Sequence, residues 1–166
     1  YGTADFDIWP PLSKLGLLFL MFVGGCAGST GGGMKVVRVL VLGKYASIGL
    51  EQACRPMIVR TLKLGRAPVE TDTRDAIVVF FFLSLSLLVF CSMAIAAMGV
   101  DIGTAFSSVV ATLNNIGPGL ARVGPTQNYA FLPAAGKALL SLCMVLGRLE
   151  LITILVLFMP SFWRAH

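Results

Sequence analysis

The sequence predicts an all-α integral membrane protein, and three observations support this fold class. Of the 166 residues, 57% are hydrophobic and only 13% are charged, whereas a soluble domain carries about 25% charged residues. Residues 76–100 contain no charged side chain. Two glycine-containing segments, residues 24–33 and 114–119, interrupt apolar stretches.

Residues 76–100 form the clearest predicted membrane span. A span needs about 20 apolar residues at a rise of about 1.5 Å each, and this run is long enough to cross with some tilt. The competing interpretation is a buried core helix of a large soluble protein. Such helices rarely reach this length, which favours the membrane.

The beginning of the chain does not resemble a secretory signal peptide. Asp5 and Asp7 follow Tyr1 closely, and no basic segment precedes an apolar stretch. Because the first residue is not Met, we expect the natural protein to extend further upstream. The four cysteines are scattered and His166 is the one histidine, so neither a metal site nor a disulfide framework is expected.

Residues 1–54 predict two half-helices joined at a glycine-rich break. The Trp9-Pro10-Pro11 cluster is typical of a helix start at a membrane interface. Residues 15–23 are apolar, and residues 36–42 are apolar again except for Arg38. About nine helical residues reach only half of a hydrocarbon layer of about 30 Å. The break at residues 24–33 is therefore expected at membrane depth.

Residues 55–73 predict a polar cytoplasmic connector. Between residues 35 and 74, eight basic residues stand against three acidic ones. A basic segment can bind nucleic acid, but this one lies between two membrane segments, and the positive-inside rule places it in the cytoplasm. No nucleic-acid partner is therefore expected. Residues 1–14 and 99–137 are then outside, and the C-terminus is cytoplasmic.

Residues 102–120 predict a re-entrant hairpin rather than a second span. Residues 106–113 favour a short helix, and residues 114–119 are too polar and too broken to continue it. Residues 122–137 are predicted to form a loop, and residues 138–163 the last span, with Arg148 inside it. Residues 74–166 thus have the order span, re-entrant helix, span.

The break after the short helix carries one functional hypothesis. Non-helical backbone at membrane depth survives only inside protein or beside a water-filled cavity. Residues 114–118 are interpreted as a cation selectivity filter, whose carbonyls replace the hydration shell of the ion. An extracytoplasmic turn is the alternative, since Asn, Gly and Pro are ordinary turn residues. The proposed filter residues are Asn114, Asn115, Ile116, Gly117 and Pro118, with the ion at Asn115 and Ile116.

The first break contains six glycines in ten positions, more than close helix packing of the GxxxG kind requires. A mobile intramembrane loop that gates the pore and simple packing both stay open as interpretations. A phosphate-binding loop is excluded, because no Gly-Lys-Ser/Thr sequence ends the segment. The loop residues concerned are Gly24, Gly25, Gly28, Ser29, Thr30, Gly31, Gly32 and Gly33.

Arg148 places a charge inside the last predicted span, at a cost of roughly 2.5–3.5 kcal/mol on insertion scales. It is therefore expected to face the bundle interior or water, where it can act as a pore charge and as a partner of the gating loop. An arginine that extends to the membrane surface is the alternative.

The motifs resemble those of the TrkH-type potassium transporters of the Trk/Ktr/HKT superfamily. Residues 24–35 are similar to the intramembrane loop of their third repeat, and residues 112–119 to the filter of their fourth. Residues 146–150 resemble the arginine motif of their last helix, and residues 1–6 the segment after their third filter. The order and spacing of these motifs agree along essentially the whole chain, which is therefore interpreted as a C-terminal fragment.

The resemblance implies a K+-channel-like fold of four membrane-helix/pore-helix/membrane-helix repeats around one pore. Residues 1–54 would end the third repeat and residues 74–166 form the fourth. The implied function is K+ uptake across the cell inner membrane, with no covalent cofactor. The implied partners are membrane lipid, the missing upstream repeats, a second copy in a homodimer and a cytosolic nucleotide-binding regulatory subunit of the TrkA kind.

Two other function classes are weighed against a channel. A secondary transporter would build a midplane substrate site from broken helices and use polar coupling residues in its spans, of which this sequence has few. An enzyme needs a nucleophile and base or a metal set, and no His or Asp lies within a predicted span. The sequence therefore favours a channel lined by carbonyls.

Overall fold

The computed structural model describes residues 4–26, 29, 32–55, 62–64 and 67–149. This part of the chain is mostly helical, as predicted. The helices are α1 (Pro11–Val23), α2 (Val36–Cys54), α3 (Thr71–Ala97), α4 (Ile102–Leu113) and α5 (Ala134–Arg148). Three short 3-10 helices are η1 (Phe6–Ile8), η2 (Ala121–Val123) and η3 (Tyr129–Phe131). The expected all-α fold is modified by one hairpin of β1 (Lys63–Leu64) and β2 (Ala67–Pro68).

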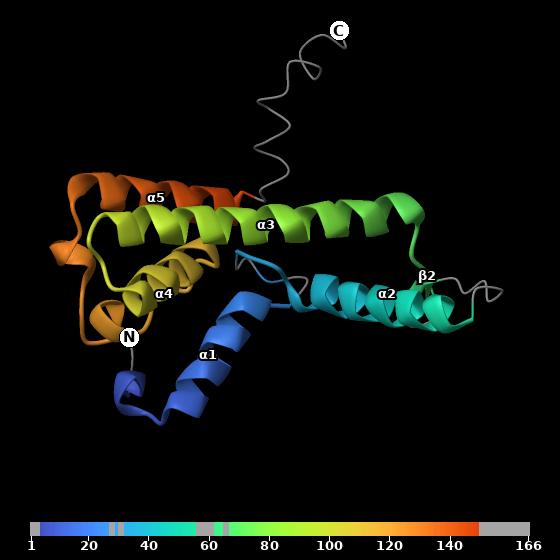
Figure 1. Ribbon diagram of the computed structural model, residues 1–166, viewed down its shortest axis with the longest axis horizontal. Coiled ribbons are helices and arrows are strands. Elements are labelled where there is room, and N and C mark those ends of the chain that lie inside the picture. The colour runs from blue at the N-terminus through green and yellow to red at the C-terminus, as the bar shows by residue number, and fades with distance from the viewer. Residues whose placement is uncertain (1–3, 27–28, 30–31, 56–61, 65–66, 150–166) are drawn as a thin grey trace, which may run out of the picture.

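The helices are arranged around the short helix α4. Figure 1 shows α3 and α5 running side by side, with α4 packed beneath them, α1 crossing below α4, and α2 below the other half of α3. The main hydrophobic core lies where α3, α4 and α5 meet, and Met34 joins it from the segment before α2. Every long helix described here therefore packs on α4 or on its neighbour α3.

The predicted break between two helices is present. Helix α1 begins with Pro11 at its first position, a place where the missing N–H of proline costs nothing. It ends at Val23, where Gly24 adopts a φ of +75°. Helix α2 begins only at Val36, and the backbone N–H of Val36 donates to the Gly25 carbonyl at 3.0 Å. A backbone hydrogen bond thus joins the two ends of the break.

Helix α2 and the connector pack against the start of α3. The Arg38 guanidinium lies 4.2 Å from the centre of the Phe80 ring, a cation–π distance. The Lys44 ammonium donates to the Lys63 carbonyl at 3.0 Å and ties α2 to the hairpin. Helix α3 already begins at Thr71, inside the range predicted for the connector.

Helix α3 has the properties of a membrane span. Its six buried residues recur every three or four positions from Ile77 to Ile95 and form one stripe. Large apolar side chains such as Phe82, Phe90 and Met93 are more than 60% exposed. A core helix of a soluble protein would bury them. Within the described residues, α3 is the one helix long and apolar enough to cross a membrane by length and composition.

Helix α4 begins at Ile102, earlier than the predicted residue 106, because Asp101 caps it. The Asp101 carboxylate accepts from the backbone N–H groups of Gly103 at 3.1 Å and Thr104 at 3.3 Å. Nine of its 12 residues are buried. The buried hydroxyls of Ser108 and Thr112 each donate to a carbonyl one turn earlier at 2.8 Å. A segment that contains several hydroxyls can therefore lie in the core.

The predicted loop of residues 122–137 contains the turns η2 and η3, and α5 begins earlier than expected, at Ala134 after Pro133. One stripe of α5 is buried through Gly136, Leu140 and Cys143. The last span was predicted to run to residue 163. Its first part is helical up to Arg148, and residues 150–163 lie outside the described residues.

The cap of α4 generates a testable prediction for the full-length protein. Asp101→Ala should destabilise the protein by about 1 kcal/mol, because two N–H groups at the helix start lose their acceptor. The thermal midpoint in detergent measures this change. The matched variant Asp101→Asn keeps an acceptor oxygen and should restore most of the loss. Equal midpoints for Asp101→Ala and the parent protein would contradict the capping role.

Candidate selectivity filter and intramembrane loop

The C-terminus of α4 is closed by a complete Schellman motif that leads directly into the candidate filter. The Asn115 N–H donates to the Thr112 carbonyl at 3.1 Å, and the Ile116 N–H donates to the Ala111 carbonyl at 2.9 Å. Asn115 occupies the left-handed position with a φ of +54°, where Gly or Asn is preferred. The sharp turn after α4 is therefore specified by local hydrogen bonds.

The two asparagine side chains brace this turn. The Asn114 amide donates back to the Val110 carbonyl of α4 at 2.9 Å. The Asn115 amide donates across to the Met144 carbonyl of α5 at 3.1 Å. Asn114 is buried, whereas Asn115 is exposed. Each side chain thus fixes the turn to a different helix.

The carbonyl groups of the candidate filter fall into two classes. Gly117, with a φ of +100°, directs its carbonyl to the Tyr129 hydroxyl, which donates to it at 2.8 Å. Burial raises the pKa of Tyr129, so its hydroxyl keeps the proton that it donates. Within the described residues, no hydrogen bond ends on the carbonyls of Asn114, Asn115 or Ile116. Those three oxygens thus have no donor among the described residues.

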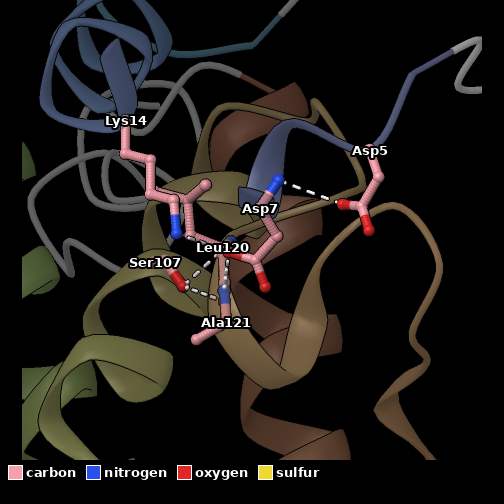
Figure 2. Close-up of polar contacts among 6 residues, drawn as sticks. All are labelled: Asp5, Asp7, Lys14, Ser107, Leu120 and Ala121. Atoms are coloured by element: carbon pink, nitrogen blue, oxygen red, sulfur yellow. Dashed lines mark hydrogen bonds and ion pairs between the residues drawn. The ribbon is translucent and has the colours of Figure 1, made fainter. Parts of the chain in front are cut away.

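The chain after the filter returns along α4 and is held there by one serine. The Ser107 hydroxyl lies 3.0 Å from the Leu120 carbonyl oxygen and 3.2 Å from the Leu120 nitrogen, as Figure 2 shows. Gly119 allows this approach, since a Cβ atom there would lie 3.1 Å from the Ser107 carbonyl oxygen. Leu120 and Val123, which follow the candidate filter in the chain, are buried.

The end of the glycine-rich loop lies against the filter asparagines. A Cβ atom on Gly33 would collide with the Asn114 carboxamide oxygen. A Cβ atom on Gly32 would lie 2.6 Å from the Asn115 amide nitrogen and 2.8 Å from the Gly147 carbonyl oxygen. The next residue, Met34, is only 3% exposed and lies in the hydrophobic core. Glycine is therefore required here by close approach.

The remaining loop residues are placed only in part. Gly24 and Gly25 directly follow α1. The Ser29 N–H donates to the Cys26 carbonyl at 2.9 Å. The predicted loop residues Gly28, Thr30 and Gly31 lie outside the described residues. Arg148 is the last residue of α5 and is exposed in this chain. Its neighbour Gly147 contacts the loop.

Several residues of this region were not singled out from the sequence. Gly147 approaches the Leu113 carbonyl so closely that a Cβ atom would overlap it. Tyr129, Ser107 and Asp7 contact the candidate filter or the segment that follows it through side chains. These contacts join residues 12 to 114 positions apart. No local sequence pattern predicts them. Among the described residues, no group of three or more His, Cys, Asp or Glu could hold a metal ion.

Comparison with known proteins decides the family. The profile of the TrkH cation transport proteins matches residues 1–165 of this chain. The chain belongs to the TrkH family. It is 44% identical over 164 residues to the Trk system potassium uptake protein TrkH of Escherichia coli K12, and 41% identical over 165 residues to that of Vibrio parahaemolyticus.

The structural comparison agrees with the family. The crystal structure of the potassium transporter TrkH from Vibrio parahaemolyticus matches with a TM-score of 0.88 at 41% identity, over 99% of this chain and 35% of that one. Each alignment to the two sequence relatives covers 99% of this chain and 34% of the relative. The chain thus spans about a third of the length of its relatives, which are named as transport proteins and not as enzymes.

The contact of Gly147 with α4 can be tested by adding one methyl group. Gly147→Ala in the full-length protein should destabilise it by about 1–3 kcal/mol, because a methyl group there overlaps the Leu113 backbone. Gly43→Ala in the exposed part of α2 meets nothing within 4 Å. This control should be neutral or stabilising by up to about 1 kcal/mol. Equal thermal midpoints for the two variants would show that the close approach is absent.

Proposed function

We propose that this chain is part of a potassium uptake protein of the cell inner membrane and that residues 114–118 supply one strand of its selectivity filter. The observation that carries the proposal is a set of three carbonyls, on Asn114, Asn115 and Ile116, that accept no hydrogen bond within the described residues. They lie at the C-terminal end of a buried half-length helix. Carbonyl oxygens replace the hydration shell of K+ in such filters, and the negative end of the helix dipole adds to the attraction.

We place K+ in this proposal at Asn115 and Ile116. Asn115 and Ile116 are exposed and offer the carbonyls that contact the ion, while Gly117 and Pro118 carry the chain away. One strand cannot surround an ion, so the other strands must come from the rest of the full-length protein. The named activity of the relatives, potassium uptake, supports K+ as the transported ion.

The remaining parts of the proposal concern assembly. Helices α3, α4 and α5 correspond to the fourth repeat, and residues 1–54 to the end of the third. An apolar groove of about 660 Å³ between α1 and α4 offers a surface for the upstream repeats, and the exposed apolar side chains of α3 suit lipid. Residues 55–73 and the C-terminus are cytoplasmic. The partners are a second copy and a cytosolic nucleotide-binding regulatory subunit.

The filter assignment is tested at Gly117. Its φ of +100° is unfavourable for any other residue, although a side chain would meet nothing within 4 Å. Gly117→Ser should lower the ratio of K+ to Na+ uptake by about tenfold, since such backbone strain costs about 1–3 kcal/mol. Radioactive Rb+ and Na+ uptake by cells measures the ratio.

The control for this test is Gly49→Ser, a change in open space on the exposed side of α2. It should leave both expression and the uptake ratio unchanged. A Gly117→Ser protein that reaches the membrane and keeps the parental ratio would refute the filter assignment and favour the alternative of a simple turn or a midplane transporter site.

The gating part of the proposal assigns residues 24–33 to a loop below the filter, with Arg148 beside it. Two contacts support this position: Gly32 lies against Asn115 and Gly147, and Gly33 against Asn114. Arginine has five donors that can bind loop carbonyls, and its charge raises a barrier to a cation. Met34 in the core provides a fixed end about which the loop can move.

The gate predicts an increase of function on mutation. Removing the loop, or changing Arg148→Ala, should raise K+ flux through the full-length protein in liposomes. A barrier lower by about 1.4 kcal/mol corresponds to about a tenfold rise. Arg74→Ala is the matched control, because Arg74 pairs with Asp75 at 2.7 Å in the first turn of α3. Unchanged or lower flux in an assembled Arg148→Ala protein would leave only the packing interpretation of the glycines.

A further inference from the structure

The segment behind the filter ends in an unfavourable backbone conformation. Ala121 has a φ of +58°, in the left-handed region that side chains with a Cβ atom rarely adopt. No residue preference selects this conformation, since alanine has neither the freedom of glycine nor the local hydrogen bonds of asparagine. Contacts from elsewhere in the fold must hold Ala121.

One contact to Ala121 comes from the other end of the chain. The Ala121 N–H donates to the Asp7 carboxylate at 3.0 Å, across 114 positions of sequence. The same carboxylate oxygen lies 3.5 Å from the Lys14 ammonium. Figure 2 shows Asp7 between Lys14 and Ala121, with Ser107 and Leu120 adjacent. The two charged side chains are each about 30% exposed, at 28% for Asp7 and 32% for Lys14.

Local structure fixes Asp7 in this place. Asp5 caps the short helix η1, and its carboxylate accepts from the Asp7 N–H at 3.0 Å. Pro11 then starts α1, whose first turn carries Lys14 back toward Asp7. The capped turn, the start of α1 and the ion pair with Lys14 therefore all help to position the Asp7 carboxylate. That carboxylate accepts from the Ala121 N–H group.

This contact differs in origin from the other supports of the filter. The Gly117 carbonyl is held by Tyr129, and Leu120 is held by Ser107, and both partners belong to the unit of residues 102–131. Asp7 and Lys14 belong to the segment that precedes α1. Of the side-chain hydrogen bonds to residues 117–121 within the described structure, the one from Asp7 is the bond that enters from outside this unit.

We infer that Asp7, oriented by Lys14, is a positioning residue for the filter. Its carboxylate holds Ala121 in the left-handed conformation, fixes the outer end of the segment behind residues 114–118, and so couples the region before α1 to ion selectivity. The inference rests on the proposed function, because it needs residues 114–118 to be the filter. It adds a hydrogen bond from a distant part of the chain to the contacts that hold the filter in place.

The experiment measures the ratio of Rb+ to Na+ uptake by cells that express full-length variants. Asp7→Ala should lower the ratio about three- to tenfold, because the Ala121 N–H loses its carboxylate acceptor. Asp7→Asn keeps an acceptor and should recover much of the loss. Asp72→Ala, which removes an exposed carboxylate from the first turn of α3, should leave the ratio unchanged.

A second variant tests the mechanism itself. Ala121→Gly removes the penalty for a positive φ, so the filter should depend less on Asp7. Asp7→Ala should therefore lower the ratio less in the Ala121→Gly protein than in the parent protein. Equal losses in the two backgrounds would overturn the claim that Asp7 acts by holding the Ala121 conformation.

Two further outcomes separate this inference from the proposed function. If Gly117→Ser lowers the ratio and Asp7→Ala does not, the positioning role of Asp7 is refuted and the filter assignment stands. If neither variant changes the ratio, the filter assignment fails and the inference fails with it. Should Asp7→Ala not reach the membrane, Lys14→Met decides, because it leaves the backbone contacts in place. An unchanged ratio in Lys14→Met then overturns the inference.

Discussion

A helix of 12 residues cannot cross a hydrocarbon layer, since it reaches only about 18 Å of the roughly 30 Å required. The backbone groups at its two ends have no partner within the helix, and other protein groups must satisfy them. Asp101 does so at the N-terminus, and the Schellman turn does so at the C-terminus. The helices α1, α3 and α5 contact α4, and nine of its 12 residues are buried.

The hydrogen bonds of this turn leave the carbonyls of residues 114–116 without a donor among the described residues. The backbone N–H groups of Asn115 and Ile116 donate to carbonyls of α4. The side-chain amides of Asn114 and Asn115 donate to carbonyls of α4 and α5, respectively. No donor in the described structure remains to cover the carbonyls of residues 114–116. This arrangement of acceptors is the basis on which we propose a cation site at residues 114–116.

The sequence predicted the elements better than their contacts. The break after Val23, the proline start of α1 and the long apolar helix α3 follow from local composition and are present. The start of α4 was misplaced because the cap at Asp101 outweighs the weak helix preference of Gly103 and Thr104. The supports by Tyr129, Ser107 and Asp7 could not be foreseen, because side chains that meet across a fold leave no periodic signal.

The close packing of the glycine loop on the filter makes the proposed gate and filter mechanically dependent. Gly32 fills the space beside the Asn115 amide, and that amide is the brace between the filter turn and α5. A loop that leaves this position exposes one side of the brace and opens a gap beside Gly147. The turn of α4 is held by its own hydrogen bonds, so it can keep its shape during this change. The local Schellman bonds thus allow a gate to lie directly against a filter without dismantling it.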